Sequence, residues 1–134
     1  IEGEITTYNT FRIDGYIHKN FYEDAPLKDY SSWGDLREFC FHIIRGKRTP
    51  LNFRFILSLP KEEFEAFLID QEIPSLSHSD IQGLYLNFKY DGTNLQCITG
   101  TSLNIFTMDK TLENVWDNYA RKFFLNKEID FESL

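Results

Sequence analysis

Residues 83–108 read GLYLNFKYDGTNLQCITGTSLNIFTM and contain three runs rich in β-branched and aromatic residues. Asp91-Gly92 separates the first run from the second, and Gly100 comes before the third. An Asp-Gly pair between such runs is the sequence signal of a tight β-hairpin. These residues therefore predict an antiparallel meander of three strands.

The residues before this meander predict a strand and two helices. Residues 51–59, LNFRFILSL, alternate in the way that a half-buried strand does. Pro60 follows and opens a short acidic helix that extends to Ile69. Further upstream, Ser32 is placed to cap a helix, and Gly46 follows its last apolar residue, where helices often end.

Both ends of the chain add further elements. Asp14-Gly15 lies between two β-rich runs and predicts a first hairpin, and residues 111–125 predict a last helix with a loose acidic tail after it. The order β-β-α-β-α-β-β-β-α is that of an α+β fold, a mostly antiparallel sheet with helices on one face. We expect residues 1–134 to form a single domain. We also expect an N-terminal element to be missing, because strand-like sequence begins at Ile1.

The composition is that of an acidic globular protein. The 134 residues are 42% hydrophobic and 26% charged, and the net charge is −7. This charge argues against indiscriminate binding to nucleic acid or anionic membranes. No apolar run approaches the roughly 20 residues that cross a bilayer, and no secretory signal occurs. Cys40 and Cys97 share no metal-ligand spacing, so we expect reduced thiols in a cytoplasmic protein that contacts no membrane.

The sequence contains no motif of known catalytic chemistry. No GxSxG nucleophile turn, HxxxH metal pair or GxxxxGK[ST] phosphate loop occurs. We therefore expect no catalytic residue, metal or cofactor, although an enzyme stays open. The alternative is a small hydrolase or ligand-binding protein with a site near His78 and Asp80, in the serine-rich run SLSHSD.

A basic island interrupts the acidic chain, because no acid occurs between residues 38 and 62. The island includes Lys47, Arg48 and Arg54. One interpretation is structural, since cations that follow a helix bond its last carbonyl groups. The other is a polyanion-binding site, because Arg54 is expected on the face of its strand opposite the buried phenylalanines. The structural interpretation does not explain Arg54, and both alternatives remain open.

Several aromatic side chains fall outside the predicted core stripes. They are Phe41, Tyr85, Phe106 and Phe124. Aromatic residues are enriched in the buried centres of interfaces, so these four predict a surface for a second copy of the chain or for another protein. The alternative is that they pack beneath loops or a segment outside the sequence.

Two resemblances rest on these motifs. The segments TYNTFRIDGYIHKNFY, FCFHIIRGKRTPLNFRFILSL and GLYLNFKYDGTNLQCITGTSL resemble a family of small proteins of unknown function from clostridia-like bacteria. That resemblance implies a bacterial cytoplasmic protein with no assigned activity. Residues 51–108, with the helix SLPKEEFEAFL before the meander, resemble one half of a bacterial DNA sliding-clamp domain.

The clamp resemblance has a second motif and one departure. The strand FRIDG is similar to the run F-x-L-x-G that closes a clamp half-domain. Clamps carry TDG-x-RL where this chain has TGTSL, residues 99–103, without the arginine. The resemblance implies a clamp-like fold with a cationic surface that faces DNA. Our leading hypothesis is therefore a non-enzymatic interaction module that contacts protein or nucleic acid, although fold alone does not determine function.

Overall fold

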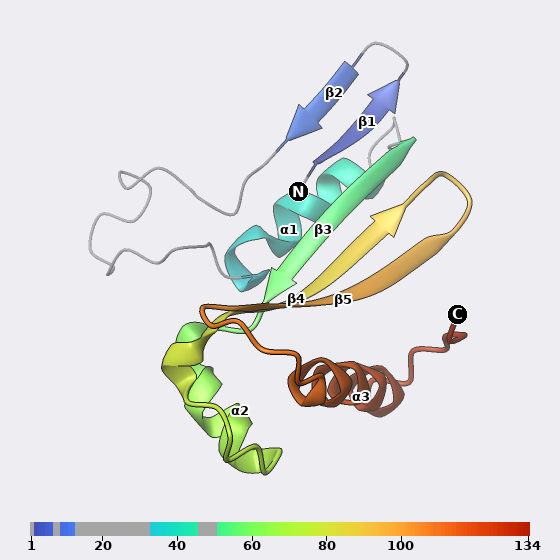
Figure 1. Cartoon of the computed structure of the whole chain (residues 1–134). Coiled ribbons are helices and arrows are strands. Elements are labelled where there is room, and N and C mark those ends of the chain that lie inside the picture. The colour runs from blue at the N-terminus through green and yellow to red at the C-terminus, as the bar shows by residue number, and fades with distance from the viewer. Residues whose placement is uncertain (1, 7–8, 13–32, 46–50) are drawn as a thin grey trace, which may run out of the picture. The chain divides into compact units, whose positions relative to one another are not determined.

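The computed structural model describes residues 2–6, 9–12, 33–45 and 51–134, and it has an α+β fold (Figure 1). The strands are β1 (Glu2–Thr6), β2 (Asn9–Arg12), β3 (Asn52–Ser58), β4 (Ile81–Tyr90) and β5 (Leu95–Leu103). The helices are α1 (Trp33–Arg45), α2 (Phe64–Asp70) and α3 (Thr111–Asn126), with 3-10 turns η2 (Lys61–Glu63) and η3 (His78–Asp80). The predicted fold class is confirmed.

The strands form one sheet in the order β2-β1-β3-β4-β5. β1 pairs antiparallel with both β2 and β3, and Glu2 is the partner of Arg54 on β3. The directions of β3, β4 and β5 alternate along the chain (Figure 1). The prediction of a mainly antiparallel sheet is therefore confirmed.

The turn at Asp91-Gly92 is also confirmed. The Asp91 carboxylate accepts hydrogen bonds from the backbone N–H groups of Thr93 and Asn94, both at 2.8 Å. Gly92 has φ +98°, a left-handed conformation in which a side chain is strained. The Asp-Gly pair therefore supplies both the acceptor and the backbone freedom that reverse β4 into β5.

The predicted turn at Gly100 is wrong, because β5 continues through this residue to Leu103. A Cβ on Gly100 would lie 3.4 Å from the Asn87 amide and 3.8 Å from Cβ of Tyr85. These are ordinary van der Waals distances, so neither a turn nor a close approach of the strands requires glycine at this position. The residues after Leu103 form no strand before α3, so the meander predicted with three strands has two.

The turn of the first hairpin lies at a different position in the sequence from the one expected. The partners Glu2↔Arg12 and Thr6↔Asn9 place the connection of β1 and β2 at residues 7–8. The predicted turn at Asp14-Gly15 lies outside the described residues.

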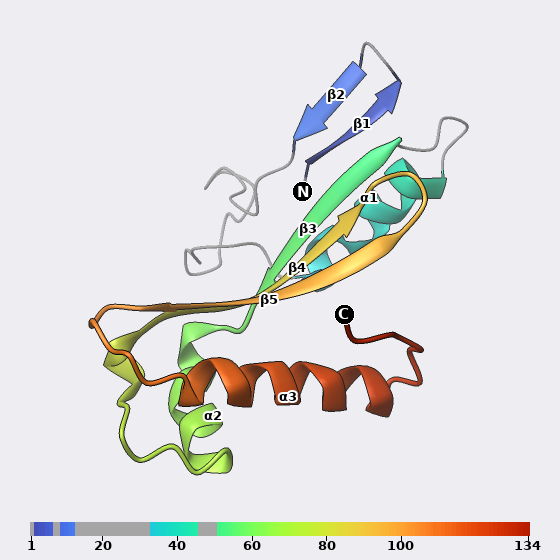
Figure 2. The ribbon, with the colours of Figure 1, turned by 45° about the vertical axis from the view of Figure 1, so that its right-hand side comes forward.

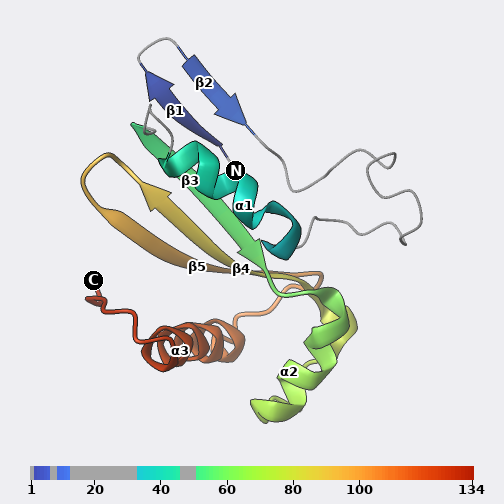
Figure 3. The same cartoon turned by 180° about the vertical axis from the view of Figure 1, so that it is seen from behind.

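The chain divides into two compact units. Unit 1 comprises Ile1–Phe55 and Phe88–Gln96, and unit 2 comprises Ile56–Asn87 and Cys97–Leu134. In unit 1, α1 lies across one face of β3 (Figure 3). The ring of Trp33 meets Phe55 edge-on at 5.8 Å, and Phe53 contacts the ring of Tyr90 at 5.1 Å. These aromatic contacts hold helix and strands together on this face.

Unit 2 contains the main hydrophobic cluster of the described residues. Its members come from α2, the following loop, β4 and α3: Phe64, Phe67, Leu68, Ile73, Ile81, Leu84, Leu112 and Trp116. Figure 2 shows α3 running past α2, where Phe67 meets Trp116 edge-on at 5.6 Å. The Trp116 Nε1–H group donates to the Tyr85 carbonyl oxygen at 2.9 Å, which fixes α3 against β4. The surfaces around α2 therefore lie on a packed hydrophobic core.

Candidate functional site

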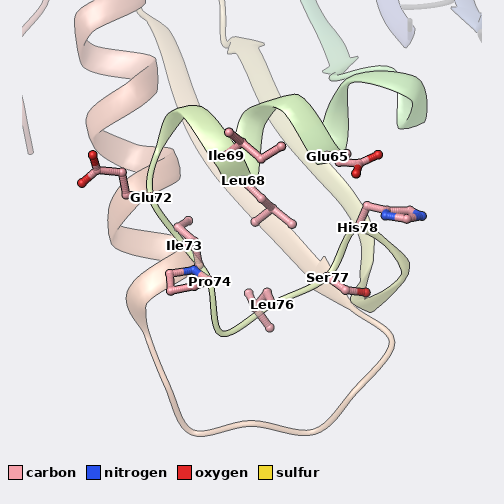
Figure 4. A pocket seen from close by; sticks show the side chains of 9 residues that line it. All are labelled: Glu65, Leu68, Ile69, Glu72, Ile73, Pro74, Leu76, Ser77 and His78. Atoms are coloured by element: carbon pink, nitrogen blue, oxygen red, sulfur yellow. The ribbon is translucent and has the colours of Figure 1, made fainter.

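A groove of about 500 Å³ lies in unit 2 between α2 and the loop that follows it (Figure 4). Its lining residues come from α2 and from residues 72–78: Glu65, Leu68, Ile69, Glu72, Ile73, Pro74, Leu76, Ser77 and His78. Five of these side chains are apolar. A concave surface of this size, largely apolar with a few polar groups at its edge, is typical of binding sites.

The end of α2 creates one side of the groove. Glu72 has φ +55°, and its N–H group donates to the Ile69 carbonyl at 3.1 Å, while the Ile73 N–H group donates to the Leu68 carbonyl at 2.9 Å. This pair of bonds around a left-handed residue is a Schellman motif, which ends a helix and reverses the chain. Pro74 follows and cannot extend the helix. The reversed chain carries Ile73 and Leu76 back along α2. The side chain of Leu68, which belongs to α2, points toward these two residues (Figure 4).

The turn η3 fixes the other end of the loop. The Ser77 N–H group donates to the Asp80 carboxylate at 2.9 Å, and the Ser79 N–H group donates to Ser77 Oγ at 3.3 Å. These bonds form a capping box, so Asp80 has a structural role and is not part of the groove lining. His78 does line the groove, although Figure 4 shows its ring directed away from the apolar side chains. Of the two residues that the sequence placed near a site, His78 lies at the edge of the groove and Asp80 caps η3.

The loop between β5 and α3 lies beside η3 and presents apolar side chains to solvent. The Asn104 N–H group donates to the Asp80 carbonyl at 2.8 Å, and the Asn104 amide donates to the Ser79 carbonyl at 3.0 Å. Beyond this anchor, Phe106 is 95% exposed and Met108 is 84% exposed. The loop that is hydrogen-bonded to η3 therefore carries two large apolar side chains in contact with solvent, in addition to the groove.

The groove lies in an acidic part of the chain. Residues 61–80 contain six carboxylates and Lys61 as their one ammonium group, a net charge of −5. Two of these carboxylates, Glu65 and Glu72, line the groove, and both side chains are exposed. The apolar floor therefore has a negatively charged rim.

The four aromatic residues predicted to form an interface have different environments. Phe106 is exposed, whereas Phe41 is half-buried and lies between the guanidinium groups of Arg37 and Arg45, at 5.5 and 5.3 Å. Tyr85 is half-buried, and its ring covers Gly83. Phe124 is buried in unit 2, and the interface role of these four residues stays a prediction.

The reason for the burial of Phe124 lies in the tail. The Ile129 N–H group donates to the Phe124 carbonyl at 2.9 Å, and the Phe131 ring lies 5.7 Å from the Phe124 ring. The tail, which was expected to be loose, thus folds back and covers Phe124. Phe123, the neighbour of Phe124 on α3, is 41% exposed.

A second, smaller concavity of about 270 Å³ lies in unit 1. Its lining residues belong to β3, to the end of β4 and to the turn after it: Asn52, Phe53, Arg54, Lys89, Tyr90 and Asp91. Arg54, one of the predicted polyanion-binding residues, thus shares a surface with Lys89. Lys47 and Arg48 lie outside the described residues. Hydrogen bonds from the backbone of Asn94 and Thr93 hold the pKa of the Asp91 carboxyl below its ordinary value, so the carboxylate stays charged beside the two cations.

Features of catalytic chemistry are weak in the described part of the chain. No group of three or more His, Cys, Asp or Glu residues there is arranged to hold a metal ion. Burial raises the pKa of the Cys40 and Cys97 thiols, which lowers the fraction of the reactive thiolate. Across residues 2–6, 9–12, 33–45 and 51–134, none of the helices combines the length and the apolar character that a bilayer crossing requires.

Sequence reasoning placed a possible site near His78, which lines the groove, but it missed the α2 side of the groove and Lys89. The groove depends on the left-handed backbone at Glu72, a conformation that glutamate rarely adopts and that no residue pattern announces. The signal that was present is the sequence EIPSL, residues 72–76, in which Pro74 stops the helix and two apolar residues follow a polar stretch. Lys89 alternates with Phe88 and Tyr90, so the strand pattern does place it on the face opposite the aromatic side chains.

Comparison with known proteins identifies a family but no activity. The family model described as "Family of unknown function (DUF5721)" matches residues 1–132. No curated protein and no solved structure matches the chain. The resemblance to a sliding-clamp half-domain therefore stays a prediction.

Proposed function

The chain belongs to this family of unknown function, and we propose that it is a non-enzymatic interaction module that binds a segment of a partner protein. The observation that supports this proposal is the apolar groove of unit 2, together with the exposed side chains of Phe106 and Met108 in the loop that is hydrogen-bonded to η3. Binding needs no catalytic group, and apolar grooves on rigid supports are common sites for protein segments.

The size of the groove supports a protein segment as its occupant. A concavity of about 500 Å³ accommodates two or three aliphatic or aromatic side chains. The groove presents few polar groups that would orient a small polar substrate. Exposed aromatic anchors such as Phe106 are the residues that supply most of the binding energy in protein interfaces.

Charge argues against a second copy of the chain as the occupant. Docking two copies through this surface would bring together two segments that each carry a net charge of −5. Juxtaposed like charges oppose association. A different protein, without this negative charge, fits the surface better.

Replacement of Ile69 by Asp tests the groove directly. Ile69 lines the groove and is 69% exposed, so the substitution places a charge in the binding surface without disturbing the core. We expect a helical peptide with Leu side chains at positions i, i+3 and i+4 to shift the amide signals of residues 68–78 and 105–108 in an NMR titration. The I69D and F106S variants should each weaken this binding at least about tenfold, which corresponds to the loss of a buried apolar anchor.

The control is Leu125→Ser on α3, because Leu125 is 66% exposed and does not line the groove. This variant should bind like the wild type. If a series of leucine-bearing peptides of positive, zero and negative charge leaves the signals of residues 68–78 unchanged, the proposed function is wrong.

A second candidate function is polyanion binding by unit 1. The observation that favours it is the shared concavity of Arg54 and Lys89, together with the predicted contribution of Lys47 and Arg48. Cationic side chains on a sheet face bind phosphates without reading bases. The alternative interpretation of the basic island, as a helix terminus, predicts no binding of nucleic acid.

A salt titration of duplex DNA binding separates these two interpretations. Each phosphate contact contributes about −0.9 to the slope of log K against log salt concentration. We expect the double variant R54A/K89A to reduce the magnitude of the slope by about two. The variant Lys122→Ala, on α3 of unit 2, is the control and should keep the wild-type slope. If the wild-type protein binds no duplex even at low salt, the polyanion-binding function is excluded.

A further inference from the structure

Two carboxylates lie at opposite sides of the apolar groove. Figure 4 shows Glu65 beside His78 on one side, Glu72 on the other, and the apolar side chains of Leu68 and Leu76 between them. Glu65 lies in the first turn of α2, and Glu72 lies two residues beyond the end of the helix at Asp70, in the turn that reverses the chain. A partner that pairs with both carboxylates therefore needs cations on both sides of the apolar surface that enters the groove.

The surroundings strengthen the negative potential of this rim. The other carboxylates of residues 61–80 belong to Glu62, Glu63, Asp70 and Asp80, and the opposing charge is that of Lys61. An apolar wall has a low dielectric constant, and clefts with charge of one sign and such walls concentrate the field. The rim thus attracts cations and repels anionic surfaces, including anionic lipid.

The form of the partner follows from the lining of the groove. An extended peptide leaves its backbone N–H and C=O groups to be paired by a free strand edge. The groove lies between a helix and a loop, and its lining is of side chains. A helix satisfies its own backbone groups and offers only side chains, so it fits this surface.

We infer that the groove binds a cationic amphipathic helix whose apolar face enters between α2 and residues 73–78, with Lys or Arg side chains at positions i and i+7 paired with Glu65 and Glu72. This inference rests on the proposed function and names the class of partner. In a helix, positions i and i+7 lie on the same face, so Lys or Arg side chains there can flank the apolar side chains between them, as the two carboxylates flank the groove.

Three synthetic helical peptides test the inference. They share the same Leu positions and differ at i and i+7, where the first has Lys, the second Gln and the third Glu. We expect fluorescence anisotropy to rank the affinities Lys over Gln over Glu, with a gain of about two- to fivefold for each exposed ion pair. Added salt should weaken the Lys peptide and leave the Gln peptide nearly unchanged.

The double variant E65Q/E72Q links this preference to the rim. It should bind the Lys and Gln peptides equally, because both carboxylates have been replaced by uncharged amides of nearly the same shape. The variant E38Q/E132Q loses two charges elsewhere, on α1 and in the tail, and should keep the wild-type preference. Both sets of residues are exposed, so neither variant should affect folding.

The outcomes separate this inference from the proposed function. If the Lys and Gln peptides bind the wild type equally well, or if E38Q/E132Q loses the preference as fully as E65Q/E72Q does, the inference is wrong while the groove remains a docking site. If none of the three peptides binds in the groove, the inference and the proposed function both fail. Tighter binding of the Glu peptide would also overturn the inference.

Discussion

Glu72 and Glu128 occupy left-handed backbone positions, with φ +55° and +56°. Glu72 ends α2, and Glu128 plays the same part at α3, where the Ile129 N–H group reaches back to the Phe124 carbonyl. Residues with a Cβ atom incur about 1–2 kcal/mol in this conformation, which glycine avoids. Since Glu128 lines neither of the two concavities described above, the strain at Glu72 reflects helix termination and is not by itself a sign of function.

Substitution of Glu128 by Gly should therefore stabilise the protein. We expect the free energy of unfolding in urea to rise by about 0.5–1 kcal/mol, because relief of the left-handed strain exceeds the added entropy of the unfolded chain. The control is Glu132→Gly in the irregular tail, which should lower the stability slightly or leave it unchanged. A clear loss of stability in E128G would show that the glutamate side chain makes a contact that outweighs the strain.

Two aromatic residues of α3 show that helical periodicity does not always predict which side chain is buried. Phe123 and Phe124 are neighbours, and each continues an apolar stripe that begins at Leu112. The spacing of Leu112, Trp116 and Ala120 by four residues favours Phe124, as the structure shows. Which of the two phenylalanines is buried also depends on Phe131, whose ring packs on Phe124 after the tail reverses at Glu128. The periodicity of the helix contains no information about this contact.

At the scale of elements, the N-terminus of α3 depends on Asp109. Its carboxylate accepts hydrogen bonds from the Thr111 backbone N–H at 2.9 Å and from the Thr111 hydroxyl at 2.6 Å. These bonds hold the pKa of the Asp109 carboxyl below its ordinary value of 3.8. A negative charge at this end also suits the helix dipole.

Replacement of Asp109 by Ala should lower the Tm, and the size of the effect should depend on pH. A carboxyl whose pKa is lowered in the folded state stabilises that state above its unfolded pKa, and this contribution disappears as the pH falls through the folded pKa. The Tm difference between wild type and D109A should therefore be largest near neutral pH and decline once the pH falls below 3.8. Circular dichroism melts at several pH values measure it.

The matched control for that series is Asp130→Ala, which removes a carboxylate from the tail and should shift the Tm little at any pH. A D109A difference that persists unchanged in acid would mean that the carboxylate is not the group that stabilises the helix end.

The elements themselves were largely predictable, and the exception is instructive. The helices, β3 and the Asp91-Gly92 hairpin follow from periodicity, capping and turn residues. The expected third strand of the meander failed because Asn104 bonds to η3, a segment 24 or more residues earlier. That contact diverts the chain after Leu103 and leaves Phe106 on an exposed loop, and it is a tertiary effect that the local sequence does not encode.

At the scale of the whole molecule, the net negative charge of the chain comes from unit 2 alone. The residues of unit 1 include nine acids and nine bases, whereas those of unit 2 include twelve acids and five bases. The net charge of −7 therefore equals the charge of unit 2. The basic island and the acidic helix after Pro60 were both visible in the sequence, but the even balance of charge in unit 1 was not, because the division of the chain into units interleaves distant segments.

The two tryptophans of the chain are divided between the units, with Trp33 on α1 of unit 1 and Trp116 on α3 of unit 2. Trp116 is 3% exposed and stacks on Tyr119 at 5.4 Å, whereas Trp33 is 41% exposed. An indole that is shielded from water emits at shorter wavelength than one in contact with it. Each unit therefore carries its own optical reporter, and the chain needs no added label for its two halves to be followed separately as they melt.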